Sequence, residues 1–295
     1  MTNRFEVSHA NYGARAMREI LKRQIETAVE ELPRGRPTDE EVHSIRKHMK
    51  AARGTLRLLR PLLSDRDYRT ENRALRDAAR AFGAARDGAV LVETLEALMQ
   101  KAKGNGARRS LAAFETELKE DADRRRIRLA RRGLRHSAAQ LRVALRRVHS
   151  WPEPEMDWRA VCRSLRASYS KGRQCARRNE RNASAGTLHE WRKRAKYLRS
   201  QLEVIEPVQH ASLQTMSGEL HQLSDQLGEE HDLTVLGDLA HQRGLERKAE
   251  RSLRKIIKRK RRKLRKWAIS VGRPLYSEKP AHFEARLRRY FRHWN

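Results

Sequence analysis

The feature that most limits how this chain can fold is a repeat that relates its two halves. Residues 42–61, which begin Val-His-Ser-Ile-Arg and end at a proline, align without a gap with residues 188–207, which begin Leu-His-Glu-Trp-Arg, at an offset of 146. A second block, residues 75–91, aligns with residues 220–236 at an offset of 145. Two blocks in the same order at nearly the same offset predict two copies of one structural unit, related by a pseudo-twofold axis.

Each copy is predicted to be a bundle of helices. Ala, Leu, Arg, Glu and Lys dominate the chain, β-branched residues are sparse, and no stretch alternates apolar and polar residues as a strand would. Breaks are predicted at residues 33–37, Pro61, residues 104–106, residues 182–186, Pro207 and Gly244, with a short helix after Pro280. We therefore expect an all-α protein, one domain over residues 1–295, built from two four-helix bundles (9–150 and 155–292) joined at the proline-rich residues 151–154.

The charge of the chain indicates an acidic partner. Lys and Arg number 67 against 37 Asp and Glu, for a formal net charge of +30, and 51 of the 67 are Arg. An arginine side chain offers a planar fork of donors that binds a phosphate group at two oxygens, so the excess favours phosphate recognition over solubility alone. Hydrophobic residues make up 38% of the chain and recur at helical spacing, which is enough to form a core.

Several classes of function are disfavoured by what the sequence lacks. The two cysteines, Cys162 and Cys175, form no Cys-x-x-Cys pair for zinc and no disulfide framework, and are expected to be thiols in a reducing compartment. Residues 1–13 lack the apolar run of a signal peptide, and no stretch approaches 18 apolar residues. We therefore expect a cytoplasmic protein without a membrane span. A phosphate-binding Gly-x-x-x-x-Gly-Lys-Ser/Thr loop is also absent.

Residues 42–60, placed on a helix at about 100° per residue, show a basic stripe beside an apolar face. The stripe shares an arc of roughly 80° and consists of His43, Arg46, Lys50, Arg53 and Arg57. The second half repeats it with His189, Arg192, Lys196 and Arg199, and has Glu203 in the place of Arg57. Like charges at this spacing destabilise a helix, so a row left without acids next to the core predicts a groove for a repeating anion. The alternative is an ordinary exposed face of a basic protein, and the recurrence in both halves favours the groove.

These blocks resemble the CHAD family, which is named for conserved histidines in an α-helical domain. Besides the two His helices, the resemblance rests on a Gly-x-x-(Arg/His)-Asp turn in each half and on Tyr169-x-x-x-Arg173 just before the second His helix, and it covers residues 9–292. It implies a basic channel between two bundles that binds inorganic polyphosphate, and association with polyphosphate granules. We expect a binding protein that catalyses no reaction and needs no cofactor. It assigns the channel to His43, Arg46, Lys50, Arg53, His189, Arg192, Lys196 and Arg199, with Tyr169 and Arg173 in support.

Two motifs suggest catalysis, and neither is expected to carry it. Residues 115–119 match the Glu-x-Glu-x-Lys signature of CYTH triphosphatases, but on a helix Glu115, Glu117 and Lys119 point to different sides. His231-Asp232, with His189, His221 and Asp238 nearby, resembles the metal-binding pair of HD phosphohydrolases. The repeat places Arg86-Asp87 at the same position, and arginine cannot ligate a metal. We expect each Asp to cap a helix or pair with an Arg, and no metal to bind.

Two alternative functions follow from these features. The first is an all-α metal-dependent phosphohydrolase, and the second is a nucleic-acid binder that relies on net charge. Residues 251–266, with eleven basic residues in sixteen, could contact nucleic acid or an anionic membrane surface, or could form the outer face of a bundle helix. Aromatic residues are only 5% of the chain, which leaves few platforms for stacking bases.

The histidines are expected to follow helix N-caps, at Thr38 or Asp39 for His43 and at Thr187 for His189. Backbone N–H groups there favour an anion. The surrounding cations should keep both imidazoles neutral in the free protein, and a bound phosphate should favour the imidazolium. Binding is therefore expected to take up protons as the pH falls from about 8 to 6.

Overall fold

The computed structural model describes residues 14–100, 105–152, 158–205 and 211–291, and shows helices and no strand among them. The first half contains α1 (Ala14–Glu30), α2 (Asp39–Leu59), a 3₁₀ turn (Arg60–Leu62), α3 (Asp65–Met99), α4 (Asn105–Arg128), a π-helical turn (Leu129–Gly133) and α5 (Leu134–His149). The second half contains α6 (Trp158–Arg181), α7 (Ala185–Val204), α8 (Ala211–Gln242), α9 (Arg247–Leu275) and α10 (Pro280–Tyr290). The predicted all-α fold class is confirmed. Of the break predicted at residues 104–106, residue 104 lies outside the described residues and Asn105 and Gly106 belong to α4. Residues 153–154 of the predicted joint and Pro207 also lie outside the described residues, and residues 151–152 are not helical.

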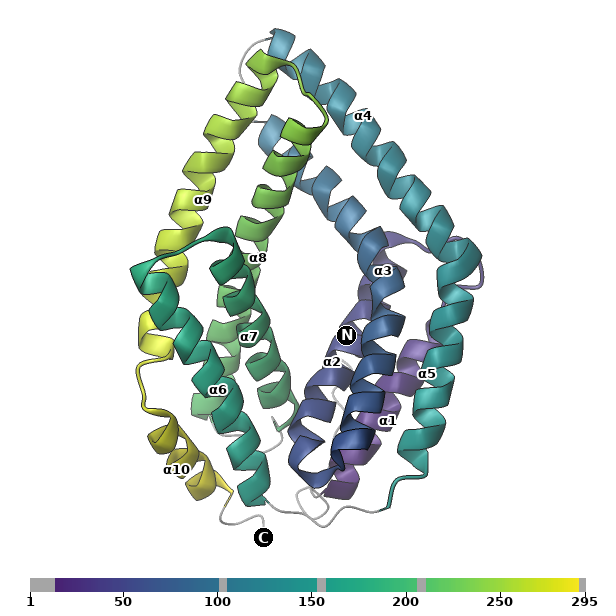
Figure 1. Ribbon diagram of the computed structural model, residues 1–295, viewed down its shortest axis with the longest axis vertical. Helices are drawn as coiled ribbons and strands as arrows, with labels where there is room; N and C mark the ends of the chain where they lie inside the picture. The colour runs from purple at the N-terminus through teal and green to yellow at the C-terminus, as the bar shows by residue number, and fades with distance from the viewer. Residues whose placement is uncertain (1–13, 101–104, 153–157, 206–210, 292–295) are drawn as a thin grey trace.

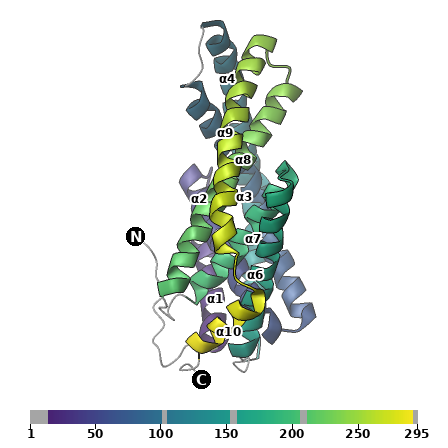
Figure 2. The ribbon, with the colours of Figure 1, turned by 90° about the vertical axis from the view of Figure 1, so that its left-hand side faces the viewer.

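The two halves of the chain lie side by side and touch at both ends (Figure 1). At the lower end in Figure 1, α2 packs against α7 and α6. At the opposite end, α3 packs against α8 and α4 packs against α9, where the four long helices converge at the top of Figure 1. Figure 2, turned by 90°, shows α9 running along the side of the molecule from this end toward α10.

The crossing of α2 and α7 brings together residues that the repeat makes equivalent. A Cβ built at Gly54 would lie 2.5 Å from Cβ of Ser200, which is its counterpart at the offset of 146. Arg57 and Tyr197, which are not counterparts in the repeat, also meet at this crossing, where the guanidinium carbon lies 3.8 Å from the ring centroid. Contact between a residue and its own counterpart is the geometry that a twofold axis through the crossing would produce.

The buried apolar residues form two separate clusters, and each cluster draws on both halves. The larger contains residues from α1 to α3, from α5 to α8, from the C-terminal part of α9 and from α10, and the smaller contains parts of α3, α4, α8 and α9 at the upper end in Figure 1. Along α3 the larger core ends at Ala85 and the smaller begins at Leu91. Along α8 the corresponding residues are Leu227 and Leu233. Residues 86–90 and 228–232 therefore form a layer between the two cores.

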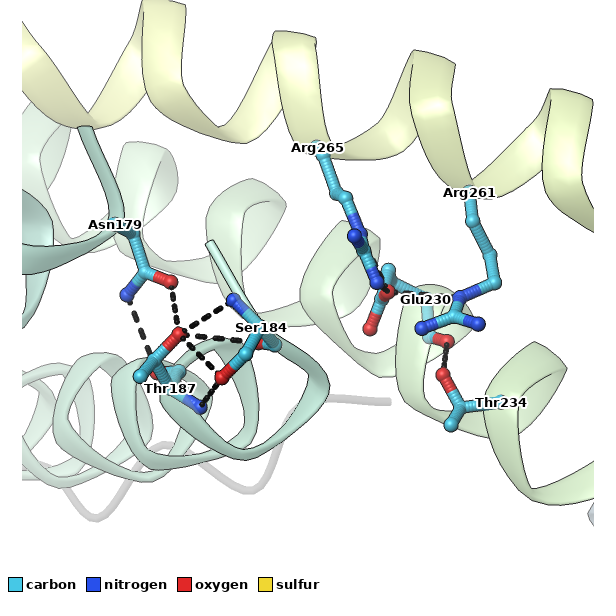
Figure 3. Close-up of polar contacts among 7 residues, drawn as sticks. All are labelled: Asn179, Ser184, Thr187, Glu230, Thr234, Arg261 and Arg265. Atoms are coloured by element: carbon cyan, nitrogen blue, oxygen red, sulfur yellow. Dashed lines mark hydrogen bonds and ion pairs between the residues drawn. The ribbon is translucent and has the colours of Figure 1, made fainter. Parts of the chain in front are cut away.

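The helices that carry the basic stripes begin at capping boxes. At α2 the Thr38 hydroxyl accepts the backbone N–H of Glu41 at 3.2 Å, and the Glu41 carboxylate accepts the N–H of Thr38 at 2.7 Å, as expected at Thr38. At α7 the expected cap at Thr187 is wrong, because the cap is Ser184. Thr187 is the third helical residue and donates its hydroxyl to the buried Asn179 at 2.7 Å (Figure 3).

The predicted turn at the Gly-x-x-(Arg/His)-Asp motifs is also wrong. Helices α3 and α8 run without interruption through Gly83 and Gly228, so neither Asp87 nor Asp232 caps a helix. The reason for glycine at these two positions is the close approach of side chains from the neighbouring helices.

Candidate functional site

The basic stripes of α2 and α7 face each other close to the helix crossing. Arg46 and Lys50 of α2 and Arg192 and Lys196 of α7 are near enough for their charges to act on one another. We call these four residues the basic cluster. Arg46 and Arg192 are counterparts in the repeat, as are Lys50 and Lys196, so the two halves contribute the same pair of side chains.

The environment of the basic cluster disfavours the positive charges of Lys196, Lys50 and Arg46. Burial, followed by repulsion from Arg192 and Lys50, lowers the pKa of Lys196 to about 7. Burial, followed by repulsion from Arg46 and Arg192, lowers the pKa of Lys50 to about 8. Burial also lowers the pKa of Arg46. The Lys50 side chain is nevertheless solvent-exposed, so the cluster is accessible from that side.

Nearby carboxylates offset these charges only in part. Asp87 favours the charged forms of Arg46 and Lys50, and Asp225 favours the charged form of Lys196. Burial raises the pKa of the Asp232 carboxyl group, and Arg192 opposes that shift. The Arg192 Nε–H is buried without a hydrogen-bond partner among the described residues. A buried unsatisfied donor is rare in folded proteins and indicates a place for an absent acceptor.

Gly83 and Gly228 make room for the two guanidinium groups of the cluster. A Cβ built at Gly83 would lie 3.0 Å from Nη1 of Arg46. A Cβ built at Gly228 would lie 3.0 Å from Nη2 and 3.2 Å from Nε of Arg192. The absence of a side chain therefore lets each arginine lie directly on the neighbouring helix, beside the Asp one turn further along.

The surroundings of the two stripe histidines, His43 and His189, disfavour their charged forms. Burial and the charge of Arg86 lower the pKa of His43. Burial and His231, whose ring centroid lies 4.2 Å away, lower the pKa of His189 to about 4. The direction of both shifts agrees with the sequence-based expectation. The first turn of α2, however, carries three acidic residues, so this helix N-terminus is not an open anion site.

The arrangement is suited to an anion with several charged oxygens. Four converging cations repel one another, and at least one of their donors is unused, so a ligand that supplies negative oxygens would relieve both costs. Among the described residues, no group of three or more His, Cys, Asp or Glu side chains is placed to hold a metal ion.

Comparison with known proteins shows which family the chain belongs to. The sequence profile of the CHAD domain matches residues 19–241. The chain belongs to the CHAD family. The profile match is narrower than the expected range of 9–292. The crystal structure of the CHAD domain from the plant Ricinus communis has the same fold, with a TM-score of 0.65 and 16% sequence identity over 93% of this chain and 95% of that chain. No curated protein sequence matches.

The remaining stripe residues of this CHAD chain are engaged elsewhere. Arg53 donates to the Asn72 side chain at 3.4 Å, and Arg57 lies over Tyr197 in the contact between α2 and α7. Arg199 donates to Glu203 at 2.7 Å and contacts His221 Nδ1 at 2.9 Å. These three arginines flank the basic cluster, and their charges are shared with other partners.

The structure does not bring Tyr169 and Arg173 into the site. The Tyr169 ring is buried, stacks on Phe283 and donates its hydroxyl to the Glu278 carbonyl at 3.0 Å. Arg173 donates to the Tyr276 carbonyl at 3.0 Å. Their assignment to the channel is therefore corrected: both join α6 to the segment between α9 and α10.

Other features singled out in the sequence lie away from the cluster. Glu115, Glu117 and Lys119 are all in α4, as expected, and Lys119 pairs with Glu115 and, at 2.9 Å, with Glu96. A groove of about 900 Å³ lies between α3 and α5, lined in part by Arg73 and His136, and no residue of the basic cluster lines it. None of the described helices is sufficiently long and apolar to span a membrane.

The acids and glycines of the site were visible in the sequence, but their role was not. Asp87, Asp232, Gly83 and Gly228 all belong to the second repeat block. The aligned Gly and Asp at four-residue spacing could have been interpreted as one helix face, since residues i and i+4 are neighbours on a helix.

Proposed function

We propose that this CHAD chain binds inorganic polyphosphate at the basic cluster and does so without catalysing a reaction. The observation that carries the proposal is the convergence of Arg46, Lys50, Arg192 and Lys196 in a partly buried position, with the Arg192 Nε–H unpaired. A phosphate chain supplies the acceptor oxygens and the negative charge that these donors lack.

The matching of the two halves favours a linear ligand without direction. The cluster receives one Arg and one Lys from each half at equivalent positions. The two directions along a linear polyphosphate chain are chemically identical, so its successive phosphates could contact α2 and α7 in equivalent ways. A single nucleic-acid strand has a direction and lacks this property. A protein with this ligand would associate with polyphosphate granules in the cytoplasm.

Binding should depend on the four cluster residues. Replacing Arg46, Lys50, Arg192 and Lys196 with Ala should weaken binding of tripolyphosphate and of long-chain polyphosphate by at least about 100-fold, because each charge-assisted hydrogen bond contributes about 1.5–3 kcal/mol. The variant should keep the helical circular dichroism of the parent and melt no earlier, since four repelling charges are removed. Isothermal titration calorimetry and thermal melting measure the two effects.

A matched control removes four exposed cations far from the cluster, Arg132, Arg135, Arg142 and Arg146, which lie on or just before α5. This control should keep its affinity for tripolyphosphate. A folded cluster variant that binds as tightly as the parent would show that the site lies elsewhere. Phosphate release from polyphosphate in the presence of Mg²⁺ or Mn²⁺, lost in the cluster variant, would contradict the absence of catalysis and favour the phosphohydrolase.

A further inference from the structure

The cations of α9 form two groups, one facing α8 and one exposed to solvent. Lys260 forms an ion pair with Glu229 of α8, and Arg261 and Arg265 each donate to Oε1 of Glu230 at 2.9 Å (Figure 3). Glu230 is buried, so these inward cations are needed to neutralise it. They are part of the packing of α9 on α8.

The remaining eight cations between residues 251 and 266 are exposed to solvent. They are Arg251, Arg254, Lys255, Lys258, Arg259, Arg262, Lys263 and Lys266. At about 100° per residue they cover about half the circumference of the helix, over a length of about 22 Å. We call this surface the α9 ridge. No ion pair joins the ridge to an acid in the part of the chain that the structure describes, and the nearest acid in α9, Glu250, pairs with His241 at 3.0 Å.

The ridge differs from an ordinary solvated helix face. On α4 the exposed cations alternate with acids, as in the pairs of Lys119 with Glu115 and of Arg124 with Glu120. On the α9 ridge, cations recur at i+3 and i+4 with no acid between them, which destabilises a helix. The two acids of α8 that pair with α9, Glu229 and Glu230, are bound by the inward cations. The ridge is thus left with a charge that an external polyanion can neutralise.

The composition of the ridge indicates a ligand recognised through phosphate groups alone. The apolar residues Leu253, Ile257 and Leu264 are buried in the core, so α9 has no apolar face to insert into a lipid surface. Trp267 is half-buried and packs against the core, so it offers no exposed platform for a base. Asn and Gln, which read adenine edges, are absent from residues 251–266. A linear polyphosphate presents only phosphates and requires none of these features.

We propose that the α9 ridge is a second binding segment for the same polyphosphate chain that occupies the basic cluster. The inference rests on the proposed function of the cluster and adds a dependence on chain length. A chain long enough to reach both surfaces binds the second as an intramolecular step, at the high effective concentration that tethering provides. A chain too short to reach the ridge binds at the cluster only.

The test compares two ligands and two variants of the full chain. In the ridge variant, Arg254, Lys255, Lys258 and Arg262 are replaced with Gln. In the control variant, Arg132, Arg135, Arg142 and Arg146 are replaced with Gln, which removes the same net charge. For the ridge variant we expect long-chain polyphosphate to bind at least about tenfold more weakly, with the slope of log K against log salt reduced by about three, since each neutralised phosphate contributes about 0.7–0.9 to that slope in nucleic acids. Tripolyphosphate should bind within about twofold of the parent in both variants.

Each other outcome overturns the inference in a recognisable way. Equal losses of long-chain binding in the ridge and control variants would show that net charge alone is responsible. Unchanged long-chain binding with weakened binding of duplex DNA, or of vesicles containing phosphatidylserine, would assign the ridge to that ligand instead. Tripolyphosphate binding that survives loss of the basic cluster would remove the proposed function itself. That result is independent of the ridge variant, so the two failures can be told apart.

Discussion

Gly83 and Gly228 occupy the middle of long helices, where glycine is less favourable than alanine by about 1 kcal/mol. Each is followed four residues later by an aspartate, Asp87 or Asp232, that helps to offset the cations of the basic cluster. The side chain missing at each glycine leaves space for the stripe arginine of the same half, Arg46 at Gly83 and Arg192 at Gly228. Helix stability is thus lower at these two residues than it could be, and the position of the cluster arginines explains why.

Replacing Gly83 and Gly228 with Ala should make the protein more stable and its binding of polyphosphate weaker. The two alanines should raise the free energy of unfolding by up to about 1 kcal/mol each. They should also displace the guanidinium groups of Arg46 and Arg192 by a few tenths of an ångström or more. We expect polyphosphate affinity to fall about tenfold, or about 1.4 kcal/mol, in calorimetric titrations.

The matched control is Gly218→Ala, also in α8, where nothing lies within 4 Å of the added Cβ. It should stabilise the protein and leave affinity unchanged. Full affinity in the Gly83→Ala, Gly228→Ala variant would mean that the present positions of the two arginines are not required for binding.

The two lysines should give binding a dependence on pH. In the free protein the pKa of Lys196 is about 7 and that of Lys50 about 8, and a bound polyanion would move both toward the ordinary lysine range. Binding should therefore take up protons above about pH 7 and weaken as the pH rises to 9, because neutral lysines must be protonated. Below about pH 6 both are already charged, and their contribution should become constant. Calorimetry in buffers of different ionisation enthalpy counts the protons.

Two variants assign this proton uptake to its source. Lys50→Arg, Lys196→Arg keeps the charge at every pH and should bind with little dependence on pH between 7 and 9. His43→Gln, His189→Gln should retain the dependence, since burial puts the pKa of His189 at about 4, below this window. The reverse pattern would restore the role first expected of the histidines, with uptake between about pH 8 and 6.

Helices α2 and α7 hold the cluster together through their close approach. Gly54 allows the α2 backbone to lie against Ser200, and Leu56, Leu198 and Leu202 bury the apolar faces of the same two helices. The distance between the two basic stripes therefore depends on a crossing one turn away from Lys50. Packing of the apolar faces opposes the repulsion between the stripes.

Gly54→Ala should separate the two helices. The added Cβ would meet Cβ of Ser200 at 2.5 Å and its backbone at 3.3 Å, so the backbone must move. Overpacking of this kind costs about 1–3 kcal/mol, which urea unfolding would measure. Ser200→Gly removes the nearest atom and should restore part of the stability in the double variant. Additive losses in the double-mutant cycle would contradict the contact.

At the scale of the whole molecule, packing of the two hydrophobic cores stabilises the fold and repulsion among its cations opposes it. Both cores take residues from the first and second halves, so the halves are packed as one unit. The net charge of +30 is spread over the basic cluster, the α9 ridge and other exposed faces. Repulsion among these charges opposes the compact state and attracts anions.

Salt should therefore act in opposite directions on stability and on binding. Added NaCl, which shortens the screening length to about 8 Å at physiological ionic strength, should raise the melting temperature of the free protein. The same salt should weaken polyphosphate binding steeply. Long-chain polyphosphate at 100 times its Kd should add about 2.7 kcal/mol to the stability. A melting temperature that falls with salt would indicate that the surface cations are already compensated by acids within the protein.

Local patterns in the chain were enough to predict the all-α class and most helix boundaries. The period of apolar residues, the proline and glycine breaks and the cap at Thr38 depend on residues within about four positions of one another. The same short-range pattern identified the stripes that contain Arg46, Lys50, Arg192 and Lys196. It also contained the Gly and Asp of the second repeat block, although the turn predicted there was wrong.

Contacts between distant segments decided what these residues do. Tyr169 is removed from solvent by Phe283, Arg199 is paired with Glu203 and His221, and Gly228 adjoins Arg192 rather than a turn. The pKa values of Lys50 and Lys196 depend on the approach of α2 to α7, whose residues are about 146 positions apart. A helix forms from hydrogen bonds between near neighbours. The desolvation and pairing of a charge are instead set by whatever the fold places next to it, and no local pattern specifies that neighbour.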